Sequence, residues 1–345
     1  MAHPGVLPGK RLRTALIPSL LVFGATYAST VTLTPSKDNT LYEIEDGSIS
    51  NGAGQYFFSG MTVEPLRKRG LIAFNLSSIP AGSTIVSATL RLNMSRTIGL
   101  PEPTSLHRLL ANWGEAGSDA PGQEGTGASA QTGDATWLHT FYPSSFWTTP
   151  GGDFDPTPSA TTTVGFEMEY FWSSPGMVAD LQGWLANPST NFGWLVFTNE
   201  NDFPSAKRFD TRENPTPANR PQLTIRYSPP GSAGSVPDGS TGPPLTVQKA
   251  GGGQVSLTWG ASCTASDTDY GIYEGTLGAF PSHHPVVCST SGALSKTFAP
   301  GAGNRYYLVV PRNASREGSY GKNSSGSERP TGTPECLLQL LAECP

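Results

Sequence analysis

The sequence predicts an all-β protein made of two β-sandwiches, the first of which carries one short helix. Only 14% of the residues are charged, and the chain holds 40 glycines and 31 prolines, so it is poor in the residues that build surface helices. Short stretches rich in Thr, Ser and aromatic residues alternate with turn residues, which is typical of strands joined by turns. With 345 residues, the chain has room for two domains of ordinary size.

The clearest strand pattern lies between Arg69 and Met94, where two β-like runs flank a turn that contains Pro80 and Gly82. In the second run, apolar and polar side chains alternate, which predicts one face in the core and the other in water. The apolar positions of that run are Val86, Ala88, Leu90, Leu92 and Met94. Further strands are expected at Asn39 to Ile44, Gln55 to Ser59, Ser105 to Leu110, Phe166 to Phe171, Phe192 to Thr198 and Gln222 to Tyr227.

One segment, Gly176 to Ala186, departs from the strand pattern. Its apolar residues recur at helical spacing, which predicts a short helix whose apolar stripe packs on the sandwich. We therefore expect Trp184 in the core rather than in a ligand platform. The apolar positions are Met177, Val178, Leu181, Trp184 and Leu185.

Residues 1–28 are typical of a secretory signal peptide. Basic residues precede an apolar run from Ala15 to Ala28, and this run is shorter than the about 20 residues that span a bilayer. Thr26 and Ala28 before Ser29 form an imperfect cleavage site. We therefore expect a secreted protein, extracellular or at the cell surface, without a transmembrane segment; an uncleaved anchor is the alternative.

The charge balance argues against a nucleic-acid partner. The formal net charge is −5, and removal of Lys10, Arg11 and Arg13 with the signal peptide would take it to −8. Binding to nucleic acid requires clustered Lys and Arg on one face, so an acidic chain of this kind is expected to have other partners.

The stretch from Pro229 to Pro244 consists mainly of Pro, Gly and Ser, which is typical of a flexible linker at a domain boundary. It separates a first domain, residues 29–228, from a second, residues 245–330. In the second domain we expect strands at Gln254 to Trp259 and Arg305 to Val310. Residues 331–345 are expected to form a tail closed by its own pair of cysteines.

All four cysteines, Cys263, Cys288, Cys336 and Cys344, lie in the last quarter of the chain. In an oxidising compartment they predict two disulfides, and four cysteines allow three pairings. Proximity in sequence favours Cys263 with Cys288 and Cys336 with Cys344. A zinc site with the neighbouring His283 and His284 is the alternative.

The segment from Arg69 to Leu92 resembles the DNRLRE domain of secreted bacterial proteins. Its Leu-Ile-Ala-Phe-Asn-Leu-Ser-Ser-Ile-Pro-Ala-Gly and Ala-Thr-Leu-Arg-Leu motifs carry the resemblance, together with Lys37 to Glu43, Gly133 to Trp137, Pro150 to Phe154, Arg208 to Glu213 and Arg220 to Tyr227. The resemblance covers most of residues 29–228. It implies a jelly-roll β-sandwich related to carbohydrate-binding modules, some of which bind acidic polysaccharides such as alginate.

The second domain is similar to fibronectin type III modules. Trp259 stands where such modules keep a core tryptophan, and Asp269 to Gly275 resembles the strand that follows. A bridge between Cys263 and Cys288 would be a departure from most of these modules. The resemblance implies a second, smaller β-sandwich that acts as a spacer.

A long stretch from Trp113 to Asp155 is rich in Gly, acidic and aromatic residues but lacks strand or helix periodicity. Such a loop in a compact domain is functional or disordered. Aromatic faces stack on the C–H groups of sugar rings, which makes this loop a candidate glycan site; the alternative is that its tryptophans form a small core. The candidate ligand-binding residues are Trp113, Trp137, His139, Tyr142 and Trp147.

Two further sets of residues are candidate sites. An acidic polysaccharide would need a basic patch, for which Arg67 to Arg69 and the group Lys207, Arg208 and Arg212 are candidates, unless they are ordinary solvated surface. Calcium prefers hard oxygen ligands from loops, and a structural calcium ion is a candidate cofactor. Its expected ligands, which are otherwise turn residues, are Asp38, Asn39, Glu43 and Asp210.

No catalytic motif is recognisable: the sequence has no Gly-x-Ser-x-Gly elbow, His-Glu-x-x-His or phosphate loop. Three functions follow as hypotheses. The preferred one is a secreted, non-catalytic module that binds polysaccharide or cell-surface glycan through its first sandwich. The second is an adhesive protein that associates with protein partners. The third is a polysaccharide hydrolase or lyase that uses His107 or His139 as a base, or the acidic pairs Glu167 with Glu169 and Asp153 with Asp155.

Overall fold

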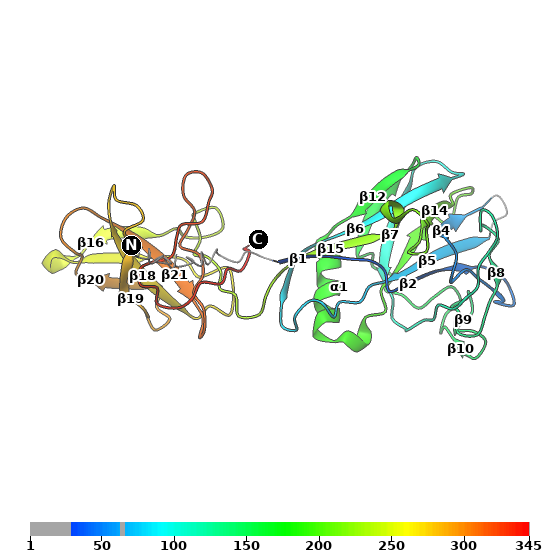
Figure 1. The fold of residues 1–345 in the computed structure, drawn as a ribbon, viewed down its shortest axis with the longest axis horizontal. Coiled ribbons are helices and arrows are strands. Elements are labelled where there is room, and N and C mark those ends of the chain that lie inside the picture. The colour runs from blue at the N-terminus through cyan, green and yellow to red at the C-terminus, as the bar shows by residue number, and fades with distance from the viewer. Residues whose placement is uncertain (1–28, 63–65, 345) are drawn as a thin grey trace, which may run out of the picture.

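The protein is all-β with one α-helix among the residues that its computed structural model describes, 29–62 and 66–344. Figure 1 shows two bodies, one built from β1 to β15 and the other from β16 to β21. This confirms the predicted fold class. The predicted signal peptide lies outside the described residues, and within them no helix is long and apolar enough to cross a membrane.

The first body is a curled antiparallel sheet in the order β1-β15-β6-β14-β4-β5-β13-β7-β11, with β12 paired to β6 and β2 paired to β5. Its strands are β1 (Ser29–Leu33), β2 (Lys37–Tyr42), β4 (Tyr56–Met61), β5 (Arg67–Ala73), β6 (Thr84–Thr97), β7 (Glu102–Arg108), β11 (Ala160–Val164), β12 (Met168–Trp172), β13 (Trp194–Thr198), β14 (Lys207–Asp210) and β15 (Gln222–Ser228). Two short pairs lie outside this sheet: β3 (Ile49–Ser50) with β8 (Ala128–Ser129), and β9 (His139–Phe141) with β10 (Ser145–Phe146).

Strand β6 shows how the alternating pattern becomes a core. Ala88, Leu90, Leu92 and Met94 are buried as predicted, but Val86 is only half-buried, and Ile85 takes the inward position instead. The reason is a bulge in the pairing with β15, where Arg226 lies opposite Ser87 while Tyr227 lies opposite Ile85. One extra residue in one strand reverses which face the following side chains occupy.

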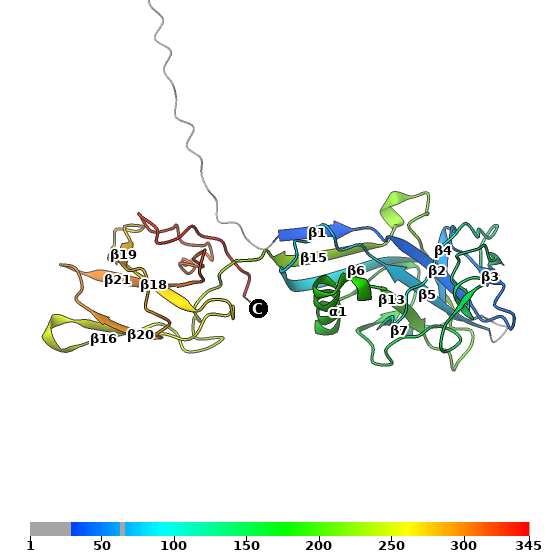
Figure 2. The same cartoon turned by 90° about the horizontal axis from the view of Figure 1, so that it is seen from below.

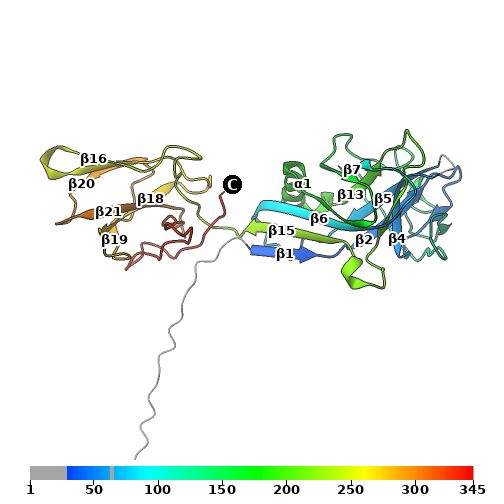
Figure 3. The same ribbon diagram turned by 90° about the horizontal axis from the view of Figure 1, so that it is seen from above.

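The predicted helix is α1 (Pro175–Ala186), which lies against β6 in Figures 2 and 3. The Ser174 side chain accepts a hydrogen bond from the Met177 backbone N–H and so caps the first turn. The buried stripe of Met177, Leu181, Trp184 and Leu185 joins the main core, as expected from the helical spacing. Two single turns of 3-10 helix, η1 (Pro188–Thr190) and η2 (Pro217–Asn219), complete the first body.

The second body consists of two three-stranded sheets, β16-β17-β20 and β19-β18-β21. Its core gathers Leu257, Trp259, Tyr270, Ile272 and Val309 between them. Its elements are β16 (Thr246–Lys249), η3 (Gly251–Gly253), β17 (Val255–Thr258), β18 (Asp269–Thr276), β19 (His284–Val287), β20 (Ser295–Phe298) and β21 (Arg305–Arg312).

The structure confirms two disulfides but corrects their pairing, which is Cys263 with Cys344 and Cys288 with Cys336. Sequence proximity was the wrong guide because the C-terminal segment runs back along the second body. Backbone bridges join it to that body at Gln339, opposite Glu317, and at Leu341, opposite Ala233. Residues 331–344 are therefore part of the second body and not a tail closed on itself. All four thiols are used, so the zinc alternative has no cysteine ligand.

The segment predicted as a flexible linker is only partly one. Residues 232–234 are buried and Ala233 is fully so, whereas residues 238–241 are exposed. The Ala233 backbone N–H donates to the Leu340 carbonyl, and Glu343 forms an ion pair with Arg226 at 2.7 Å. Small side chains let the returning C-terminal segment approach closely, which composition alone does not reveal.

Candidate functional site

The long loop from Trp113 to Asp155 is ordered and covers a second core. Trp113, Trp137 and Trp147 are 1%, 5% and 5% exposed and pack with Leu71 and Leu195 of the sheet. The indole N–H of Trp113 donates to the Phe192 carbonyl, and that of Trp147 to the Thr136 carbonyl. Buried rings cannot stack on a sugar, so these three residues are core and not a binding platform.

The other two candidate ligand-binding residues lie beside these tryptophans. His139 is buried, with its Nδ1 2.8 Å from the Thr136 hydroxyl, and its ring contacts those of Tyr142 and Phe146. Burial lowers the pKa of His139. Tyr142 is half-buried, and Phe146 is the exposed ring of this group, at 62%. One exposed ring does not make a flat platform.

The candidate catalytic groups all have structural partners. The Nδ1 of His107 donates to the Asp155 carbonyl at 2.9 Å, and its Nε2 lies 2.8 Å from the Ser105 hydroxyl. Asp153 accepts hydrogen bonds from two backbone N–H groups of its own loop, while Asp155 pairs with Arg108 and Glu169 with Arg91. Each of these groups is therefore engaged in contacts within the fold.

A cavity of a different kind, which we call the basic groove, opens where the ends of β4, β5, β6 and β14 meet the loop at residues 123–126. It consists of two adjoining hollows with volumes of about 260 and 520 Å³ that share Thr62, Lys68, Ile98 and Gly125. Among the described residues, five cationic side chains and one carboxylate, that of Glu43, line it. The cationic residues are Arg67, Lys68, Arg96, Lys207 and Arg208.

Strand register explains why these cations meet. In the pairing of β14 with β6, Arg208 lies opposite Arg96 and Lys207 opposite Thr97, and on the other side of β14 Arg208 lies opposite Phe58. Lys68 lies opposite Tyr42 of β2, and its ammonium is within 6 Å of the Tyr42 and Phe58 ring centroids. Basic groups from three strands, β5, β6 and β14, thus gather around aromatic rings, an arrangement that favours cation–π contacts.

The hydrogen-bond partners of Arg96, Lys207 and Arg208 among the described residues are all uncharged. Arg96 and Arg208 donate to the Gln123 side chain, and Arg208 also to Ser95. Lys207 donates to the Thr97 hydroxyl and, at 2.6 Å, to the Leu100 carbonyl. Within the described part of the chain none of the three forms an ion pair, whereas Arg67 pairs with Glu43. Burial lowers the pKa of both Lys207 and Arg208.

The wall of the groove at residues 123–126 is fixed by Glu124. This side chain is 4% exposed, and its carboxylate accepts hydrogen bonds from Asn51 and from the backbone N–H groups of Gln55 and Tyr56. Glu124 has a φ of 62°, a left-handed conformation that is uncommon for a residue other than Gly. The three hydrogen bonds hold it there and keep Gln123 against Arg96 and Arg208.

The expected calcium ligands do not come together. Asn39 Oδ1 accepts three hydrogen bonds, from Thr40, Ser50 and Asn51, and Glu43 is paired with Arg67. Asp210 accepts from Asn93. Of the four, only Asp38 meets other carboxylates.

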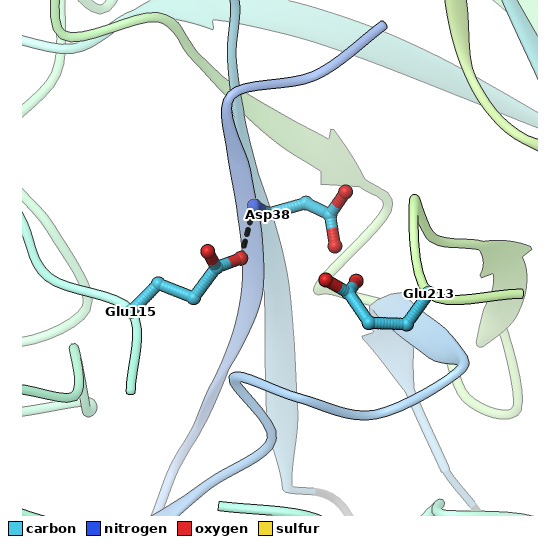
Figure 4. Close-up of side chains that lie close together, drawn as sticks. All are labelled: Asp38, Glu115 and Glu213. Carbon is cyan, nitrogen blue, oxygen red and sulfur yellow. Dashed lines mark hydrogen bonds between the residues drawn. The ribbon is translucent and has the colours of Figure 1, made fainter. Parts of the chain in front are cut away.

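Those carboxylates are Glu115 and Glu213, and we call the three residues the acid cluster (Figure 4). One carboxylate oxygen from each lies within 4.8 Å of those of the other two. The side chains come from β2, from the long loop and from the segment after β14, and Arg212 pairs with both glutamates. Burial raises the pKa of Glu115 to about 7, and burial together with the charge of Glu213 raises that of Asp38 well above its ordinary range.

Comparisons with known proteins do not assign this chain to a family. No family model matches it, and no curated protein does. Among solved structures it is similar to the glycoside hydrolase domain of Endo-D from Streptococcus pneumoniae R6, at 11% identity and a TM-score of 0.18, over 82% of this chain and 34% of that one. It is also similar to a β-1,2-glucanase from Parabacteroides distasonis, at 13% identity and a TM-score of 0.17, over 88% of this chain and 35% of that one. The chain spans about a third of the length of these structures, and likeness at this level assigns neither fold nor function.

Sequence reasoning noted the basic runs 67–69 and 207–212 separately but missed Arg96 and Gln123, which complete the groove. It also missed Glu115 and Glu213 as neighbours of Asp38. The register of β14 against β6 joins residues 110 positions apart, and no local pattern in the sequence encodes such a distance.

Proposed function

We propose that the first sandwich is a non-catalytic module that binds an anionic polysaccharide in the basic groove. The observation that carries the proposal is the set of Arg96, Lys207 and Arg208, three cations whose described partners are all neutral, at one cavity of an acidic protein. A uronate carboxylate bound to Arg96 and Arg208 would supply the missing counter-charge, and the fully buried Lys207 would add its positive charge without touching the ligand. Arginine suits this task because its planar guanidinium binds a carboxylate through two parallel hydrogen bonds.

Apolar side chains around the cations fit the rest of a sugar ring. Ile98 and Leu100 are 44% and 78% exposed, and the carbonyl of Leu100 holds the Lys207 ammonium. The rings of Tyr42 and Phe58 form the floor beneath Lys68. Carbohydrates present both hydroxyl groups and apolar C–H faces, so a groove with cationic and apolar walls can contact both.

The contacts and burial of the candidate catalytic carboxylates support a binding role without catalysis. Asp153 accepts hydrogen bonds from its own loop, and Asp155 and Glu169 form ion pairs with arginines. In the acid cluster, Asp38 is only 1% exposed. Two disulfides are typical of proteins in oxidising compartments. We propose on this basis that the protein works outside the cytoplasm.

Gel retardation on polysaccharides tests this proposal. The protein should be retarded by alginate and polygalacturonate but not by neutral glucans, and added salt should weaken retardation by screening the charges. No new reducing ends or unsaturated products should form during the incubation. Equal retardation by neutral polysaccharides would contradict the proposal, and turnover would favour a hydrolase or lyase instead.

Arg96 is the side chain to replace, because it is exposed and contributes little to the core. Arg96→Ala should weaken binding to the anionic polysaccharide about tenfold or more, since a hydrogen bond to a charged group contributes roughly 1.5–3 kcal/mol. Arg226→Ala removes an exposed arginine from β15, outside the groove, and is the matched control. Titration by calorimetry measures both; equal losses in the two variants would point to net charge rather than the groove.

A further inference from the structure

The acid cluster has two carboxylate oxygens that the described residues leave without a partner. Asp38 Oδ1 and Glu213 Oε2 are both buried and accept no hydrogen bond, while the other oxygen of Asp38 accepts from the Arg212 backbone N–H. Asp38 itself is 1% exposed, and its side chain points toward Glu213 (Figure 4). A buried carboxylate oxygen without a donor is unfavourable unless a proton or a cation lies against it.

The spacing of the cluster fits one ion. Two oxygens bound to the same calcium at 2.3–2.6 Å can lie no more than about 5 Å apart, and the three carboxylate oxygens here are all within 4.8 Å of one another. Calcium accepts irregular sets of hard oxygen ligands, with water filling the remaining positions. The partial exposure of the Glu213 side chain, 24%, leaves a path for the ion and its water.

The charges of the acid cluster also favour a divalent cation. The three carboxylates lie around one guanidinium group, that of Arg212. It forms an ion pair with Glu115, and its Nε lies 3.0 Å from Glu213 Oε1. The nearby Lys37 ammonium donates hydrogen bonds to the Asn112 side chain and the Trp113 carbonyl, and it lies over the face of the Trp113 ring. When all three carboxylates are ionised, two negative charges remain, and one divalent ion balances them.

We propose that the acid cluster is a calcium site that fastens the long loop to the sheet. Asp38 lies on β2, Glu115 on the loop after β7, and Glu213 after β14. The hydrogen bond from the Asp38 backbone N–H to Glu115 at 2.7 Å already joins two of these segments, 77 positions apart in sequence. An ion held by all three joins them to the third. This inference is independent of the ligand in the basic groove.

Thermal unfolding and calorimetric titration of the metal-stripped protein test the proposal. Millimolar CaCl₂ should raise Tm by about 5 °C or more, and one calcium should bind per chain. Glu213→Gln, which keeps the volume but removes a ligand charge, should abolish both effects. Asp119→Asn, an exposed acid on the same loop, should leave them unchanged.

Two outcomes would overturn the proposal: no calcium-dependent shift in the wild type, or the same shift in Glu213→Gln as in the wild type. The first would mean that a shared proton, and not an ion, occupies the cluster. If Glu213→Gln does not fold, anomalous diffraction from wild-type crystals grown with terbium is the alternative test. The proposal predicts a terbium ion between Asp38 and Glu213, and no ion at that position would contradict it.

Discussion

Replacing Trp137 by alanine is expected to lower the free energy of unfolding of the first body by about 3–5 kcal/mol, the cost of emptying a large buried site. Trp137 is 5% exposed and sits in the core beneath the long loop. The guanidinium groups of Arg67 and Arg69 also lie over its ring, at 5.2 and 4.9 Å from the ring centroid. Urea unfolding measures the loss.

Phe146→Ala is the matched control for this change. Phe146 lies on the same loop but is 62% exposed, so its removal should change stability by about 0.5 kcal/mol or less. A Trp137→Ala protein of wild-type stability that no longer binds polysaccharide would contradict the structural role and restore the loop as a sugar platform.

The second large effect is expected from the disulfide between Cys288 and Cys336. Replacing both by serine should destabilise the second body by about 4 kcal/mol, because the bridge closes a loop with a sequence separation of 48. For a body of this size that corresponds to a fall in Tm of roughly 15 °C or more. Differential scanning calorimetry should show the transition of the second body moving while that of the first stays in place.

Peptide mapping under non-reducing conditions provides the control for this result. It should recover Cys263 linked to Cys344 and Cys288 linked to Cys336. Recovery of Cys263 linked to Cys288 would contradict the fold of the C-terminal segment, since that pairing releases residues 336–344 from the second body.

The sequence predicts what depends on local pattern. The alternation of Ala88, Leu90, Leu92 and Met94 places β6, and the spacing of Met177, Leu181 and Trp184 places α1. The bulge that turns Ile85 inward depends on pairing with β15, and this cannot be read from one strand alone. Local periodicity therefore gives the elements, and pairing between distant strands gives their register.

The candidate sites depend on contacts between residues that lie even further apart in the sequence. An aromatic residue in a loop has the same side chain whether it stacks on sugar or fills a core, so Trp113, Trp137 and Trp147 do not reveal their burial. Arg96 and Lys207 become neighbours only through β14, and Asp38 meets Glu213 only when the sheet has curled. These contacts follow from tertiary structure, which single-residue chemistry does not specify.

Hydrogen–deuterium exchange with and without oligogalacturonate tests the central claim, that an anionic polysaccharide occupies the basic groove, most directly. At a ligand concentration that gives full retardation, we expect slower exchange in peptides that cover residues 95–98, 123–126 and 206–208. Exchange in residues 137–147 and in the second body should not change. Protection confined to residues 137–147 or to the second body, or no protection anywhere, would contradict the account.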